Sequence, residues 1–292
     1  MNKLLISVVI PLYNKEKTIK KTLNSILLQS YSNYEIVIVD DGSTDDSYSI
    51  VSNYVESNIE KQRIRLLHQE NGGPSKARNT GAKHAQGEWI VFLDADDELL
   101  PDALNTFVSI IRKHPDYDII DCNKYICYGN RRTLAVHPLE GKVKNALREC
   151  YFGRVMPGNG SSAFRREFML KHLYDERIRR FEDAELLIRQ LVVARVYSSK
   201  TPTLLFNRDF AEASKPRKNV KEDYFAYLDF KKGGFWRKMC VYRFFLGERE
   251  YYPEYSKEKY VKMYRRYDWL LIYKLLNWYS KFFNLKSATY RV

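Results

Sequence analysis

Three carboxylates within four positions are the clearest chemical feature of the chain. The run Asp94-Ala95-Asp96-Asp97 directly follows an apolar segment, residues 90–93, that has the pattern of a buried strand. Carboxylates packed this closely repel one another unless a cation lies among them. Mg²⁺ and Mn²⁺ prefer carboxylate oxygens and also bind phosphates, so the run is a candidate site for a divalent cation. The alternative is a turn in which Asp96 or Asp97 caps a helix over residues 98–112.

Two more polar clusters follow predicted strands in the first half of the chain. They are Pro11-Leu12-Tyr13-Asn14 and Asp40-Asp41-Gly42-Ser43. Successive parallel strands bring their carboxyl ends to one edge of a sheet, so the clusters should meet in one crevice. A glycine-rich turn, residues 71–81, opens a helix, and its Arg78 is well suited to bind a diphosphate. The turn is not a Walker A loop, and no dinucleotide fingerprint follows the first strand, which argues against a Rossmann dehydrogenase.

The elements that must position these clusters alternate between strand and helix patterns over the first hundred residues. This alternation implies βαβ units and a mostly parallel sheet flanked by helices. A loop rich in glycine and proline, residues 156–160, is expected near a site. The predicted strands are 4–10, 35–39, 63–68, 88–93 and 118–122, and the predicted helices are 16–29, 44–55, 74–85, 99–113 and 183–194.

Charge and aromatic content divide the chain near residue 215. The formal net charge is +13, of which residues 215–292 contribute +11 from 19 Lys or Arg and 8 Asp or Glu. The same region holds 22 of the 42 aromatic residues, and this composition indicates an anionic surface or partner. No apolar run approaches the roughly 20 residues that cross a bilayer, and residues 4–10 are too short for a signal peptide, so a cytoplasmic location is expected. The four cysteines have no metal or disulfide spacing.

Four ordered motifs resemble those of the family 2 glycosyltransferases, which are inverting enzymes of the GT-A fold. The motifs are residues 9–14, residues 39–45, Asn71-Gly72-Gly73 with Ala77-Arg78-Asn79, and residues 92–97. The match covers about residues 4–105, and residues 180–186 resemble the acidic motif of the family's acceptor half. The resemblance implies an α/β fold with a GT-A-type, Rossmann-like, mostly parallel sheet. It divides the chain into a nucleotide-sugar-binding half (1–97), an acceptor-binding half of the same catalytic domain (98–214) and a basic aromatic helical extension (215–292).

The resemblance also implies roles in binding the donor. Pro11 and Tyr13 would line the pocket of the base, with the ring stacking or packing on uracil. Asp41 would accept a hydrogen bond from the uracil N3–H, which favours a UDP-sugar. Asn71 and Arg78 would hold the nucleotide and the diphosphate.

The remaining roles concern the metal and the base. Asp94 would contact the ribose or metal-bound water, and Asp96 would ligate Mn²⁺ or Mg²⁺, with Asp94 as a second metal residue; the role of Asp97 stays open. The metal would neutralise charge on the leaving UDP. Asp183 would be the catalytic base, and Glu182 would orient the acceptor or the base, with burial or the charge of Glu182 raising the pKa of the base. The alternative is that both acids simply begin a helix.

A stripe of apolar side chains at helical spacing lies within the extension. Three interpretations remain open for it: packing on the catalytic domain, contact with a membrane interface, or pairing with another copy. The members of the stripe are Tyr260, Tyr264, Tyr267, Leu271, Leu275, Trp278 and Phe282.

The sequence thus predicts a metal-dependent inverting glycosyltransferase that moves a sugar from a UDP-sugar to a hydroxyl of a glycan or lipid-linked sugar. The family's usual work suggests bacterial surface polysaccharide synthesis. Residues 215–292 are expected to allow peripheral association with the anionic inner face of the plasma membrane, and a homodimer is a further expectation; no nucleic-acid-binding fold is recognised. The rival functions are an inactive nucleotide-sugar scaffold or sensor, and a sugar nucleotidyltransferase.

Overall fold

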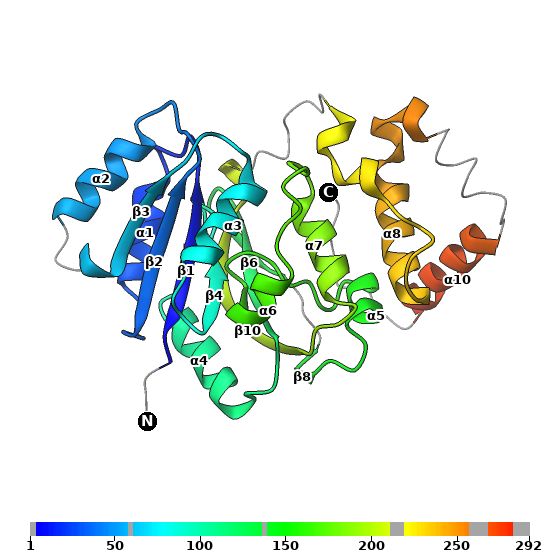
Figure 1. Ribbon diagram of the computed structural model, residues 1–292. Coiled ribbons are helices and arrows are strands. Elements are labelled where there is room, and N and C mark those ends of the chain that lie inside the picture. Colours follow the sequence, from blue (N-terminus) through cyan, green and yellow to red (C-terminus); the bar gives the residue numbers. More distant parts are fainter. Residues whose placement is uncertain (1–3, 58–60, 136–138, 211–218, 257–267, 283–292) are drawn as a thin grey trace.

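One mixed sheet runs through both predicted halves of the chain (Figure 1). The computed structural model describes residues 4–57, 61–135, 139–210, 219–256 and 268–282, and within them the sheet has ten strands in the order β3-β2-β1-β4-β9-β6-β10-β5, with β7 on β6 and β8 on β10. The first four of these are parallel, and β9 runs antiparallel to both β4 and β6. The strands are β1 Ile6–Leu12, β2 Tyr34–Asp40, β3 Ile64–His68, β4 Trp89–Phe92, β5 Glu98–Leu99, β6 Ile119–Tyr128, β7 Arg131–Leu134, β8 Gly141–Lys142, β9 Ser162–Arg165 and β10 Val196–Asn207.

Helices cover both faces of the sheet because its central strands are apolar on both sides. Along β1, Val8 and Ile10 pack with α1 and α4, whereas Val9 packs on the opposite face with α3, as the two-residue period of a strand requires. The expected α/β fold is therefore confirmed. The helices are α1 Ile19–Leu27, α2 Ser47–Ser57, α3 Pro74–His84, α4 Ala103–Lys113, α5 Ala146–Tyr151, α6 Arg166–Lys171, α7 Glu182–Gln190, α8 Phe235–Glu248 and α10 Asp268–Phe282.

Helix α3 lies so close to β1 that Gly81 has no room for a side chain. A Cβ placed on Gly81 would lie 2.3 Å from Cγ1 of Val9. We expect Gly81→Ala to lower the free energy of unfolding by about 1–3 kcal/mol, because the helix and strand must move apart. Gly247 in α8 is the matched control, since a Cβ there meets no atom within 4 Å and alanine favours a helix. Thermal unfolding of both variants tests this: equal melting temperatures would contradict the close packing.

The helix predicted over residues 99–113 begins later than expected. Residues 98–99 form β5, which pairs with β10, and α4 starts at Ala103 with Asp102 as its N-cap residue. The alternative in which Asp96 or Asp97 caps a helix over residues 98–112 is therefore wrong. Pairing with a distant strand outweighed the local helical pattern here, and such pairing cannot be read from nearby residues.

The C-terminal extension packs on the catalytic body through aromatic side chains. Tyr151 and Phe152 of the body contact Trp236 of α8, and Phe181 contacts Phe244, also of α8. On α10, the side chains that pack against this cluster are Ile272, Tyr273 and Leu276.

The described members of the predicted apolar stripe face solvent instead of the catalytic body. Leu271, Leu275 and Trp278 are 60%, 56% and 65% exposed, so the idea that the stripe packs on the catalytic domain is wrong for these members. The reason is that α10 is apolar on two faces, and the packing involves the other one. Tyr260, Tyr264 and Tyr267, together with the side chain of Phe282, lie outside the described residues. Among the described residues, no helix is both long and apolar enough to cross a membrane.

Candidate active site

Asn14 joins the carboxyl ends of β1 and β2 by hydrogen bonds that it both donates and accepts. Asn14 has a left-handed backbone (φ 51°), and its side-chain oxygen accepts from the Thr44 amide at 2.8 Å. The backbone amide of Asn14 donates to Ser43 Oγ at 3.2 Å. Pro11 lies in β1 beside Val39 of β2, and the ring of Tyr13, just after β1, is 38% exposed. These contacts hold the first two polar clusters together, with an aromatic ring open to solvent beside them.

Asp41 shapes the glycine-rich turn. Its carboxylate accepts from Gln69 Nε2 at 2.6 Å and from the backbone amides of Gly72 and Gly73 at 2.9 and 2.7 Å. Gly73 has φ 87°, a conformation that suits glycine, and α3 begins at the next residue. Asn71 is exposed and accepts from Nη1 of Arg179 at 3.4 Å. By fixing this turn, Asp41 places Asn71 at the edge of the crevice. The contact of Asp41 with uracil stays a prediction.

Arg78 joins the acidic motifs of the two halves. Its Nη2 donates to Asp94 Oδ1 at 2.9 Å, and its Nη1 donates to Glu182 Oε1 at 2.8 Å. The guanidinium is 5.3 Å from the centre of the Tyr174 ring, and the residue is only 6% exposed. Burial acts to raise the pKa of Asp94, but Arg78 outweighs it and lowers that pKa. Arg78 is therefore a buried connection between the two acids, and its contact with a diphosphate stays a prediction.

The other two acids of the Asp94–Asp97 turn lie in different surroundings. Asp96 accepts from Lys15 Nζ at 2.8 Å, and burial followed by the charge of Asp94 raises its pKa. Asp97 is 1% exposed and accepts from the Asn207 amide at 2.8 Å. Burial, with the charges of Asp94 and Asp96, raises the pKa of Asp97 well above its usual value. The structure thus gives Asp97, whose role was open, a position beneath the crevice that ties the turn to β10.

The predicted catalytic acids begin α7. Phe181, just before them, has a left-handed backbone (φ 56°), an uncommon conformation for a large side chain and one that clusters at functional sites. Burial raises the pKa of Glu182 to about 7 although Arg78 opposes the rise, and the charge of Asp183 adds to it. Asp183 is exposed, and its Oδ1 accepts from the Ala184 amide at 2.8 Å. Glu182 is therefore largely shielded from solvent and paired with Arg78, whereas Asp183 faces solvent.

The raised pKa of Glu182 predicts a pH-dependent stability. The folded state favours the protonated carboxyl, so this group's contribution is present below about pH 4.5 and is lost as the pH rises through about 7. We expect the melting temperature of the protein, relative to that of Glu182→Gln, to fall by a few degrees between pH 5 and 8. A constant difference for Glu182→Gln would contradict the shift.

Four residues of this site were not singled out from the sequence. They are Lys15, Tyr174, Asn207 and Asn159, whose Nδ2 donates to Asp94 Oδ1 at 3.1 Å. Asn159 belongs to the loop over residues 156–160 that was expected near a site, and Lys15 directly follows the first motif. For Tyr174 and Asn207, which come from elements distant in sequence, we find no local signal.

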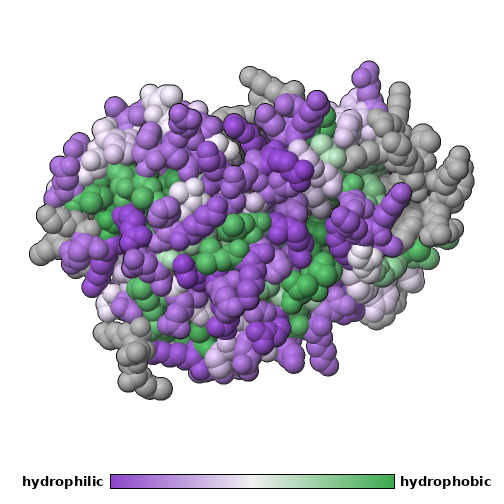
Figure 2. Space-filling view, viewed as in Figure 1, coloured by the Kyte–Doolittle hydropathy of each residue, from purple (hydrophilic) through white to green (hydrophobic). Residues whose placement is uncertain are grey.

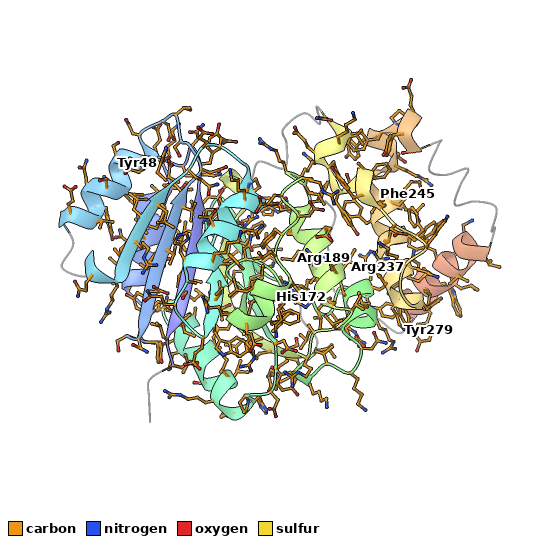
Figure 3. The ribbon with its side chains drawn as sticks, in the orientation of Figure 1. Tyr48, His172, Arg189, Arg237, Phe245 and Tyr279 are labelled. Atoms are coloured by element: carbon orange, nitrogen blue, oxygen red, sulfur yellow. The ribbon has the colours of Figure 1, made fainter. Side chains whose placement is uncertain are left out.

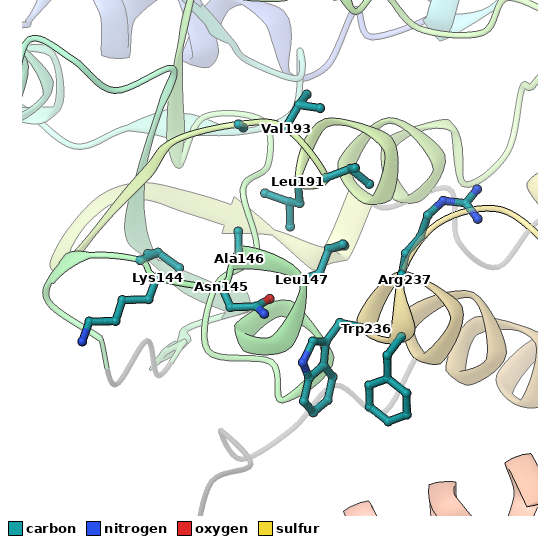
Figure 4. A pocket seen from close by; sticks show the side chains of 13 residues that line it. Lys144, Asn145, Ala146, Leu147, Leu191, Val193, Trp236 and Arg237 are labelled. Carbon is teal, nitrogen blue, oxygen red and sulfur yellow. The ribbon is translucent and has the colours of Figure 1, made fainter.

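A separate hollow of about 400 Å³ lies away from these residues (Figure 4). It is lined by residues 143–147, 191–194 and 234–237, from α5, the segment after α7 and the start of α8. No residue predicted to bind the donor or metal lines it, so it is not the nucleotide-sugar crevice.

The sequence and the fold of the chain are similar to those of known glycosyltransferases. The sequence model of glycosyl transferase family 2 matches residues 7–173, more than half of the chain. The chain is 34% identical to the uncharacterized glycosyltransferase EpsJ of Bacillus subtilis, over 62% of this chain and 54% of that protein. It is 30% identical to WcaA of Escherichia coli, described as a putative colanic acid biosynthesis glycosyl transferase, over 65% and 67%.

Some of the relatives are longer proteins, of which this chain matches only a part. The chain is 40% identical to the uncharacterized glycosyltransferase YibD of Escherichia coli, but it spans about a third of YibD and about half of EpsJ. Among solved structures, that of Staphylococcus aureus TarS in complex with UDP-GlcNAc matches with a TM-score of 0.68 and 21% identity, over 91% of this chain and 77% of TarS. At that identity, the match shows a shared fold.

Proposed function

The chain belongs to glycosyl transferase family 2, and on that premise we propose that it moves a sugar from a UDP-sugar to an acceptor hydroxyl with inversion of the anomeric carbon. The observation that carries the proposal is the bridge from Asp94 through the buried Arg78 to Glu182. This bridge links the strand-end acid expected at the donor to the helix start expected at the acceptor, so both substrates can meet there.

The donor is proposed to be a uridine nucleotide sugar. TarS has been solved with UDP and with UDP-GlcNAc, and the fold is shared. In this chain Tyr13 offers an exposed ring just after β1, and Asp41 lies buried just after the neighbouring strand β2. Screening UDP-, GDP- and dTDP-sugars for thermal stabilisation tests the proposal. Stabilisation by a UDP-sugar is expected, and stabilisation only by a GDP- or dTDP-sugar would overturn it.

Asp183 is proposed as the base that takes the proton of the acceptor hydroxyl, and Glu182 as the residue that positions it. Inversion needs an attacking oxygen on the face of the sugar opposite the diphosphate, with a base in reach. An exposed carboxylate can meet an incoming acceptor, whereas Glu182 is held on Arg78. The acceptor itself is proposed to be a glycan or lipid-linked sugar, met at the cytoplasmic face of the membrane during polysaccharide synthesis.

A Mn²⁺ or Mg²⁺ ion is proposed at Asp96, with Asp94 beside it. The carboxylate oxygens of both residues suit a hard cation, and one oxygen of the neighbouring Asp97 is buried without a hydrogen-bond partner. Among the residues that the structure describes, no group of three or more His, Cys, Asp or Glu side chains could hold a metal ion, so Asp96 and Asp94 are the two residues proposed to hold it. When bound, the ion would offset charge on the leaving diphosphate.

The ion pair between Lys15 and Asp96 leads to a prediction about metal affinity. Their side chains are only 18% and 13% exposed, so the ammonium competes with a metal for the same carboxylate. We expect Lys15→Met to tighten Mn²⁺ binding by about tenfold, or about 1.4 kcal/mol, in the absence of nucleotide, as measured by electron paramagnetic resonance. Lys21→Met is the matched control, because Lys21 pairs with Glu98 at the same 2.8 Å but is 71% exposed. Unchanged or weaker Mn²⁺ binding in Lys15→Met would contradict this competition.

A further inference from the structure

Helix α10 presents an apolar face to solvent. Leu271, Leu275, Trp278 and Tyr279 are 60%, 56%, 65% and 39% exposed, and Lys274 is exposed among them. Their spacing places these five residues, called here the outer face of α10, along one side of the helix. The other side packs on the body through Ile272, Tyr273 and Leu276. Tyr279 lies at the end of the molecule opposite Tyr48 of α2 (Figure 3).

The exposed apolar side chains of α10 are grouped along one side of a single helix. Figure 2 shows hydrophobic residues at several places on a mostly hydrophilic face, one of them at the edge where α10 lies in Figure 1. Most large exposed apolar residues elsewhere occur singly or in pairs, such as Leu28 at the end of α1. Grouped exposed apolar side chains of this kind mark sites of interaction.

The charge around α10 indicates the chemistry of the partner. Residues 259–292 contain eight Lys or Arg and a single acid, Asp268, a net charge of +7. A segment of this composition is attracted to an anionic surface, and the attraction grows with each Lys or Arg near it. Tyr and Trp mixed with Lys are also the residues found at headgroup depth.

The same charge disfavours a second copy as the partner. A two-fold dimer through the outer face would set Lys274 against a second copy of the same helix, and each copy carries +7 over residues 259–292 of its sequence. Like charges at an interface repel, whereas an anionic lipid surface offers the opposite charge to the same residues.

We propose that the outer face of α10 docks on an anionic lipid bilayer, with the helix lying in the interface. Leu271 and Leu275 enter the boundary of the acyl chains, Trp278 and Tyr279 lie among the headgroups, and Lys274 contacts lipid phosphates. This surface is distinct from the nucleotide-sugar crevice, and its function does not depend on sugar transfer.

Co-sedimentation of the full chain with vesicles tests the proposal. Vesicles of phosphatidylcholine with phosphatidylglycerol should bind the protein, and vesicles of phosphatidylcholine alone should bind it at least about tenfold more weakly. Leu275→Ser/Trp278→Ser should weaken binding to the anionic vesicles at least about tenfold. Leu28→Ser is the matched control, since Leu28 is 74% exposed far from α10, and it should bind as the unaltered protein does.

Three results would overturn the proposal. They are no binding of the unaltered protein to anionic vesicles, unaltered binding of Leu275→Ser/Trp278→Ser, or an equal loss with Leu28→Ser. Sedimentation velocity without vesicles gives a further outcome: a dimer that this double variant dissociates would assign the face to a second copy instead. UDP-sugar stabilisation of the double variant should be unchanged, which separates a failure of docking from a failure of the proposed enzyme function.

Discussion

Asp183→Asn should lower kcat by about 10³-fold and leave UDP-sugar binding within about threefold. The reason is that a positioned base contributes roughly 10²–10⁴ to the rate, whereas an exposed carboxylate at the start of α7 is not part of the proposed donor pocket. Transfer of a radiolabelled sugar from the donor found in the screen measures kcat, and calorimetry measures donor binding.

The control for this prediction is Glu185→Gln. Glu185 is also an acid in the first turn of α7, but it pairs with Arg189 at 2.8 Å. If the acids matter only because they begin a helix, the two substitutions should have similar small effects. If Asp183→Asn keeps kcat within tenfold while Glu182→Gln abolishes transfer, the base is Glu182.

Arg78→Met should lower the free energy of unfolding by about 3–5 kcal/mol and kcat by at least about 10²-fold. The substitution removes the cation that Glu182 and Asp94 share, and Asp94 keeps its hydrogen bond from the Asn159 amide; removing the buried partner of an ion pair is strongly destabilising. Denaturant unfolding and the transfer assay measure the two effects. Arg78→Lys should recover part of the stability, because the charge remains but one ammonium cannot span both acids.

The matched control is Arg177→Met. Arg177 pairs with Asp175 at 2.5 Å, but its side chain is 68% exposed, and exposed pairs contribute about 0–1 kcal/mol. If the two arginine substitutions destabilised the protein equally, burial would not be the source of the Arg78 effect.

Much of the fold could be predicted because local pattern and final structure agree in the first half. The apolar runs around β1, β2 and β4 are buried on both faces in the sheet, so their sequences show them directly as strands. The local pattern and the structure disagree at residues 98–99, which form β5 because they pair with β10. They disagree again in α10, where two apolar faces are present and the sequence cannot tell which one is covered.

The candidate site divides in the same way. The motifs indicated Asp94, Asp96, Arg78, Glu182 and Asp183 as a set, because functional residue types recur at strand ends and helix starts. They did not indicate that Arg78 would bind two of these acids, since residues 104 positions apart reveal their contact only after folding. Lys15, 81 positions from Asp96, is a second case.

The sequence by itself therefore determined the residue types of the crevice, the alternation of strands and helices, and the basic character of the extension. Each of these depends on composition and spacing along the chain. Only the tertiary structure decided which cation pairs with which acid, which of the two acids of α7 is buried, and which face of α10 meets solvent. Those outcomes depend on burial and on distances between separate elements, and the free energy of a charge or an apolar side chain is set by those surroundings.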